Sequence, residues 1–116
     1  MPFEMFAGDS KRLIFSIFDK DDEPLDMTDA TVRWQASRGS LVKFSRTPSI
    51  VKTLGSGIEE TSLFDGQFVV ILNPQDTEDL SGPYYHEIEI RSALGEVSTA
   101  FSGEMTIKKN LIRPTA

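Results

Sequence analysis

Two neighbouring stretches of the chain alternate apolar and polar side chains with a period of two, and this alternation constrains the fold more than any other feature. The apolar members are Leu13, Phe15 and Ile17 in residues 11–18, and Val32, Trp34 and Ala36 in residues 30–36. Because successive side chains of a β-strand point to opposite faces, both stretches are predicted to be half-buried strands. Trp34 is the only tryptophan and has the largest apolar surface available to fill a core between sheets.

The rest of the chain is predicted to add further short strands that cover this pair. The expected strands are residues 3–6, 41–44, 49–54, 58–61, 67–72, 83–91 and 97–108. Turn residues separate them, and Gly103 permits a bend or bulge in the final strand, on which Val97, Thr99, Phe101, Met105 and Ile107 share one parity. A single helical turn is expected after residue 72, because Asn73 is a capping residue, Pro74 suits the first helical position and Gly82 ends the segment.

This pattern predicts an all-β chain, an immunoglobulin-like antiparallel β-sandwich of seven to nine strands with one short helical turn between Pro74 and Leu80. The 116 residues are expected to form one domain, long enough to bury a core without cross-links. The core is expected over about residues 8–108, with a short N-terminal arm and a C-terminal tail.

Composition argues against several classes of function. The net charge of −6 disfavours nucleic acid or an anionic membrane as a partner, because phosphate binding requires a cationic surface. The chain has no cysteine and one histidine, which excludes disulfides and thiolate metal sites and leaves few other ligand sets. No apolar run approaches the length of a membrane helix, and the first six residues do not read as a signal peptide. We expect no cofactor.

Charge is unevenly distributed along the chain. Six acids lie within residues 19–29, whereas residues 30–58 contain no acid and five basic side chains. An acidic and a basic part allow copies of a domain to pack head to tail. The alternative is a pair of ordinary solvated loops, and the sequence favours this second interpretation.

The acidic turn at residues 19–23 resembles the start of a calcium loop, because oxygen ligands recur at alternate positions. Pro24 stands where such a loop requires glycine, and Ala30 stands at its twelfth position. A solvated turn with no metal is therefore the prediction, with calcium as the alternative.

No catalytic constellation is evident. His86 has the opposite strand parity to Glu87 and Glu89, so it is expected to be a half-buried, hydrogen-bonded core residue. The chain contains no Gly-x-Ser-x-Gly elbow and no phosphate-binding loop. We therefore predict that the protein is not an enzyme.

Aromatic side chains leave a carbohydrate-binding module as the alternative function. A sugar platform needs exposed rings that lie in one plane, and Tyr85 is the one candidate on an otherwise polar strand face. Trp34 shares its parity with Val32 and Ala36, which favours a place in the core.

The order of several motifs resembles a family of domains from bacteriophage tails and baseplates, in particular the N-terminal domain of phage baseplate upper proteins. The matching elements are Gly8-Asp9-Ser10, the strand at residues 13–17, the turn at residues 19–24, the run from Asp26 to Val32, residues 73–77 with Leu80-Ser81-Gly82, and residues 84–90. The likeness covers roughly residues 8–108. Asp22-Glu23 and Asp29 stand where the family usually has glycine, and the first departure should alter a tight turn.

The resemblance implies a structural role in a virion or a prophage-derived particle, in the tail or baseplate. It implies protein–protein contacts with other phage structural proteins, and with further copies of the chain as a homo-oligomer. The expected location is the virion, or the host cytoplasm during assembly. The interface candidates are large apolar side chains near the termini: Phe3, Met5, Phe6, Leu111 and Ile112.

Overall fold

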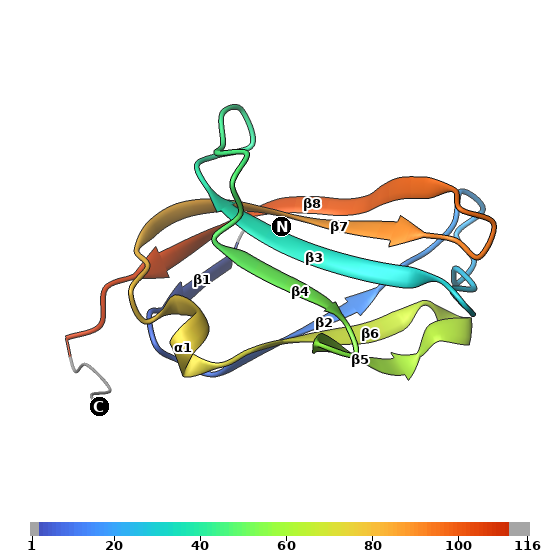
Figure 1. Ribbon diagram of the computed structural model, residues 1–116, viewed down its shortest axis with the longest axis horizontal. Helices are drawn as coiled ribbons and strands as arrows, with labels where there is room; N and C mark the ends of the chain where they lie inside the picture. Colours follow the sequence, from blue (N-terminus) through green and yellow to red (C-terminus); the bar gives the residue numbers. More distant parts are fainter. Residues whose placement is uncertain (1–2, 112–116) are drawn as a thin grey trace.

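A computed structural model describes residues 3–111 of the chain and shows an all-β protein (Figure 1). The elements are β1 (Phe3–Phe6), β2 (Lys11–Ser16), β3 (Thr31–Arg38), β4 (Ile50–Leu54), β5 (Gly57–Ser62), the 3-10 turn η1 (Leu63–Asp65), β6 (Gln67–Leu72), the single-turn helix α1 (Pro74–Thr77), β7 (Gly82–Arg91) and β8 (Val97–Lys108). The eight strands of this described part lie within the predicted range of seven to nine.

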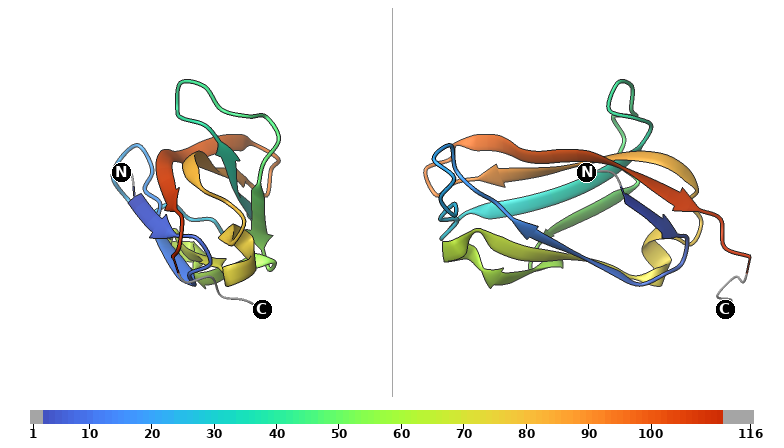
Figure 2. Two further views of the ribbon diagram at one scale, coloured as in Figure 1. Left: turned by 90° about the vertical axis from the view of Figure 1, so that its left-hand side faces the viewer. Right: turned by 180° about the vertical axis from the view of Figure 1, so that it is seen from behind.

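All eight strands belong to one hydrogen-bonded sheet in the order β1-β8-β7-β3-β4-β5-β6-β2. The sheet curls around the core, as the end-on view shows (Figure 2). Its two edge strands approach each other, since the Lys11 ammonium on β2 lies 5.6 Å from the centre of the Phe3 ring on β1. β1 pairs with β8 and β4 with β5 in parallel, so the sheet is mixed and the expectation of a purely antiparallel arrangement is wrong for these pairs.

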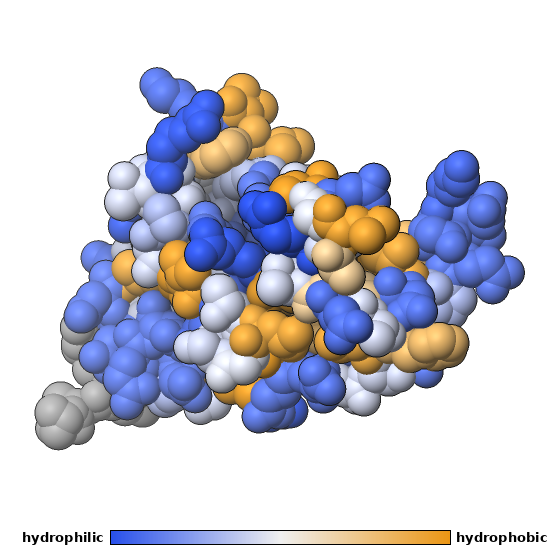
Figure 3. Space-filling view, turned by 45° about the vertical axis from the view of Figure 1, so that its right-hand side comes forward, coloured by the Kyte–Doolittle hydropathy of each residue, from blue (hydrophilic) through white to orange (hydrophobic). Residues whose placement is uncertain are grey.

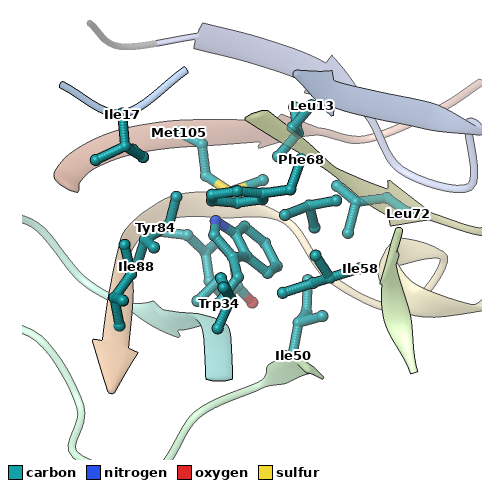
Figure 4. Close-up of a cluster of buried hydrophobic side chains, with 14 of the residues drawn as sticks. Leu13, Ile17, Trp34, Ile50, Ile58, Phe68, Leu72, Tyr84, Ile88 and Met105 are labelled. Atoms are coloured by element: carbon teal, nitrogen blue, oxygen red, sulfur yellow. The ribbon is translucent and has the colours of Figure 1, made fainter. Parts of the chain in front are cut away.

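The core is built around Trp34, which is fully buried (Figure 4). Both predicted alternations are confirmed: Val32, Trp34 and Ala36 point inward, and so do Leu13 and Ile17, with Phe15 half-buried. Around the indole pack Ile50, Ile58, Phe68, Tyr84, Ile88 and Met105. Burial of this many large apolar side chains supplies the main stabilisation of a chain without cross-links.

A bulge on β8 changes the predicted parity of that strand. Ile88 pairs with Phe101 but Glu89 pairs with Thr99, so Ala100 is the extra residue. A single extra residue turns the following side chains to the other face. Met105 and Ile107 are buried, whereas Val97 and Thr99 lie on the exposed side, which corrects the prediction that all of them share one face of the strand. The irregularity lies at Ala100 and not at Gly103.

Two aspartates take the backbone conformation that glycine usually supplies. Asp22 has φ 62° and Asp29 has φ 63°, in the left-handed region where aspartate is tolerated better than most residues. Both are positions at which the resemblance noted in the sequence implied glycine. Each of the two turns therefore has an aspartate in left-handed conformation.

The helical turn is confirmed at α1, which Asn73 precedes and Pro74 begins. The Asp76 carboxylate accepts a hydrogen bond from the Asn73 N–H at 2.7 Å. The same carboxylate forms an ion pair at 2.8 Å with Lys52, whose side chain is largely buried. This pair joins α1 to β4.

Candidate interaction surface

The N-terminal interface candidates differ in accessibility. Met5 is 6% exposed and belongs to the core, and Phe3 is half-buried with its ring edge-on to His86. Phe6 is 47% exposed, and the Lys108 ammonium lies 5.5 Å from the centre of its ring. Of the three arm residues, Phe6 therefore offers the most apolar surface to a partner.

The described C-terminal candidate, Leu111, follows a segment that lies beside this arm. β8 runs parallel to β1, and the Asn110 side-chain amide donates a hydrogen bond to the Ala7 carbonyl at 3.3 Å. Leu111 is 98% exposed. Ile112 lies outside the described residues. The structure thus brings Phe6 and Leu111 to the same end of the molecule.

A larger apolar feature projects from the connection between β3 and β4, at residues 39–49, here called the projecting loop (Figure 1). Its tip is a tight turn in which Ser40 and Lys43 exchange both backbone hydrogen bonds. The two central positions of that turn are Leu41 and Val42, which are 57% and 94% exposed. Turns of this kind usually place polar residues or glycine at such positions.

The base of the projecting loop is held firmly against the sheet. The Phe44 ring stacks on Tyr85 with 4.2 Å between centroids. The tip is also tied to the sheet, because the Glu104 carboxylate of β8 accepts a hydrogen bond from the Leu41 N–H at 2.8 Å. Residues 41–44 read as a strand in the sequence, but they form a tight turn in the structure. The sequence feature that could have indicated an exposed apolar turn is the group of apolar residues between two turn-forming residues, Gly39 and Pro48.

The opposite end of β3 is acidic. Residues 17–30, which connect β2 to β3, and the β7–β8 hairpin at residues 92–96 form what is here called the acidic end. Hydrophilic side chains dominate the space-filling view there, at the right (Figure 3). Phe18 and Leu94 are also exposed at this end, by 56% and 89%. The surface therefore combines carboxylates with accessible apolar groups.

The acidic turn is organised by hydrogen bonds within the chain. The Asp19 carboxylate accepts from the N–H groups of Asp21 and Glu23, at 2.8 Å and 3.0 Å. Hydrogen bonds from Thr28 lower the pKa of Asp26. Among residues 3–111 no group of three or more histidine, aspartate or glutamate side chains is arranged to hold a metal ion. Asp19 thus serves as a turn-forming acceptor.

A hollow of about 420 Å³ lies at the acidic end, between residues 25–30 and residues 92–98. Leu25, Ile90 and Val97 contribute apolar surface to its lining, and Asp26 and Glu96 contribute carboxylates. Its size falls in the range of pockets that accept small ligands. It can therefore accommodate apolar side chains beside a positive charge.

His86 lies in the core, more deeply buried than its sequence context predicted. It is 1% exposed, and its Nδ1 accepts a hydrogen bond from the Trp34 indole at 3.1 Å. Burial lowers the pKa of His86 to about 4. Its buried Nε2 has no hydrogen-bond partner among the described residues and lies near the Phe101 ring and Gly103. These contacts give it a structural role.

The aromatic side chains considered for sugar binding are covered. Trp34 and Tyr84 are fully buried and Tyr85 is 6% exposed. The Tyr85 hydroxyl donates a hydrogen bond to the Glu87 carboxylate at 2.6 Å. Burial and this carboxylate raise the pKa of the Tyr85 phenol. The stacked Phe44 ring lies where a sugar would have to bind.

Comparisons of the chain with protein-family models, with curated proteins and with solved structures each found no match. Within residues 3–111 no helix is both long enough and apolar enough to cross a membrane.

Proposed function

We propose that this chain is a non-enzymatic structural protein of a phage or prophage particle, a tail or baseplate component that works through protein–protein contacts. The observation that carries the proposal is the exposed Leu41-Val42 tip of the projecting loop, which is supported by the stacking of Phe44 on Tyr85 and by the hydrogen bond from Leu41 to Glu104. Exposed apolar groups on a rigid support are typical of surfaces that bind another protein. The order of phage-like motifs in the sequence supports the particle as the setting.

We also propose that the curled sheet is an immunoglobulin-like sandwich of the variable type. In this proposal β1-β8-β7-β3-β4 form one layer and β5-β6-β2 the other. The short pairing of β4 with β5, at two residue pairs only, supports a division at that point. Trp34 on β3 supports it too, because immunoglobulin domains bury a tryptophan on the third strand of the sandwich. Tyr84 lies near the start of β7, two residues before His86. In immunoglobulin domains a tyrosine called the tyrosine corner lies two residues before a disulfide-bonded cysteine. Tyr84 and His86 have the same spacing, with His86 at the position of that cysteine.

In this role the partners are other structural proteins of the particle and further copies of the chain. The location is the virion, or the host cytoplasm while the particle is assembled. Phe6 and Leu111 form a second contact region at the end away from the acidic loops, and Phe3 and Met5 support it from beneath.

The test is the composition of the particles. Particles from an induced culture of the source strain would be purified on a density gradient and analysed by quantitative mass spectrometry. The chain should be present in a fixed ratio to the other structural proteins across the particle fractions. Its presence only in the soluble lysate would refute the proposal.

A further inference from the structure

The projecting loop and the acidic end lie at opposite ends of the same strands. β3 begins at the acidic end and leads into the projecting loop. β7 starts beside this loop, where the Pro83 carbonyl accepts a hydrogen bond from the Gly39 N–H, and runs back to the acidic hairpin. Eight residues of extended strand, roughly 25 Å, separate the two regions. The loop of one molecule therefore cannot reach its own acidic end.

The projecting loop has unpaired positive charge beside its apolar tip. Lys43 and Arg46 are exposed, and neither takes part in an ion pair within the described part of the chain. In the space-filling view, hydrophobic and strongly hydrophilic side chains adjoin at the top, where this loop projects (Figure 3). The loop thus presents two aliphatic side chains with two cations close in sequence.

The acidic end has the complementary arrangement. Its hollow has an apolar part at Leu25, Ile90 and Val97 and carboxylates at Asp26 and Glu96. Asp21 is a further exposed acid, on the same connection between β2 and β3 that lines the hollow. Opposite charges around an apolar centre are the usual arrangement of a specific protein contact.

We propose that the occupant of the hollow is the projecting loop of a second copy of this chain. Leu41 and Val42 enter the hollow, while Lys43 and Arg46 lie against its carboxylates. Such a contact is heterologous, so each molecule offers one loop and one hollow and the copies join head to tail. The inference rests on the proposed assembly role and names a partner for it. A contact of this size is weak in solution and gains strength when many copies are held together.

The first experiment is sedimentation of the purified chain up to about 1 mM protein. Self-association should be detectable at about 0.05 M salt and should weaken markedly at about 0.5 M salt, because the charge contribution is screened. Val42→Asp alters an almost fully exposed side chain and should raise the dissociation constant at least tenfold. A wild-type chain that stays monomeric throughout would overturn the inference.

The second experiment uses matched charge reversals. A loop variant, K43E with R46E, and an acidic-end variant, D21K with E96K, should each fail to self-associate. Mixed together, they should associate again, because the intact loop of one variant meets the intact hollow of the other and the two reversed surfaces also carry opposite charges. The control, R12E with K109E, makes the same charge change as the loop variant elsewhere on the surface and should associate like the wild type.

Absence of association in the mixture, or equal weakening by the control, would contradict the head-to-tail geometry. A negative result here is distinguishable from failure of the particle proposal. Particle composition is measured on purified virions, and a chain that never binds itself can still occur in them.

Discussion

At the scale of single residues, His86 makes the stability of the fold depend on pH. Its pKa is about 4 in the folded protein and about 6.5 in an unfolded chain. The unfolded state therefore binds more protons between these values, and stability falls as the pH drops from 6.5 to 4. The expected loss is about 3 kcal/mol, measured by urea denaturation at a series of pH values.

The variant His86→Phe provides the control for this prediction. It removes the titrating group and should flatten the stability curve between pH 6.5 and 4, although it also removes the acceptor for Trp34. If the free energy of unfolding of the variant falls equally steeply between pH 6.5 and 4, the pH dependence comes from the carboxylates and not from His86.

Asp29 allows a second test at this scale, because its backbone is left-handed. Asp29→Gly should leave the free energy of unfolding within about 0.5 kcal/mol of the wild type, since glycine adopts this conformation without strain. Asp29→Val should destabilise the protein by about 1–2 kcal/mol. Thermal unfolding of the two variants gives the comparison, and equal stability of both would show that the left-handed conformation is not required.

At the scale of elements, α1 is tied to the sheet by the ion pair between Lys52 and Asp76. Asp76→Ala removes the partner of a largely buried ammonium and the acceptor for the Asn73 N–H. It should lower the free energy of unfolding by about 3 kcal/mol. Lys52→Met should change it by less than about 1 kcal/mol, because an apolar side chain replaces the charge. Urea denaturation distinguishes them, and similar losses for both would contradict this account.

Local patterns predicted the elements well, because the alternation of apolar and polar residues directly indicates that one face of a strand is buried. β2, β3 and β7 follow from such runs, and α1 follows from Asn73 and Pro74. The bulge at Ala100 was missed because it depends on the register with β7. The parallel partners of β1 and β5 were missed for the same reason, since no local pattern specifies a distant strand.

The surface was harder to predict than the core. The tip at Leu41 and Val42 reads as a short strand in the sequence, and only the tight turn between Ser40 and Lys43 exposes it. The hollow at the acidic end joins residues about 65 positions apart in sequence, such as Leu25 and Ile90. Charge segregation was visible in the sequence, but the positions of the two charged regions at opposite ends of β3 required the fold.

At the scale of the whole molecule, the two terminal segments share one end but contribute differently. Met5→Ala should destabilise the protein by about 2–5 kcal/mol, because it empties a core position. Leu111→Ala should change stability by less than about 0.5 kcal/mol, because the side chain is exposed. Calorimetry of the two variants tests the division, and a large effect at Leu111 would show that it packs against the protein.

The pairing of β1 with β8 has a consequence for biosynthesis. Phe3 lies opposite Met105, about a hundred residues later in the chain. While the polypeptide emerges from the ribosome, the first strand has no neighbour until the final one has been translated. Closure of the sheet therefore has to await nearly complete synthesis, and a nascent chain stalled before β8 would keep Met5 without the strand beside which it is buried.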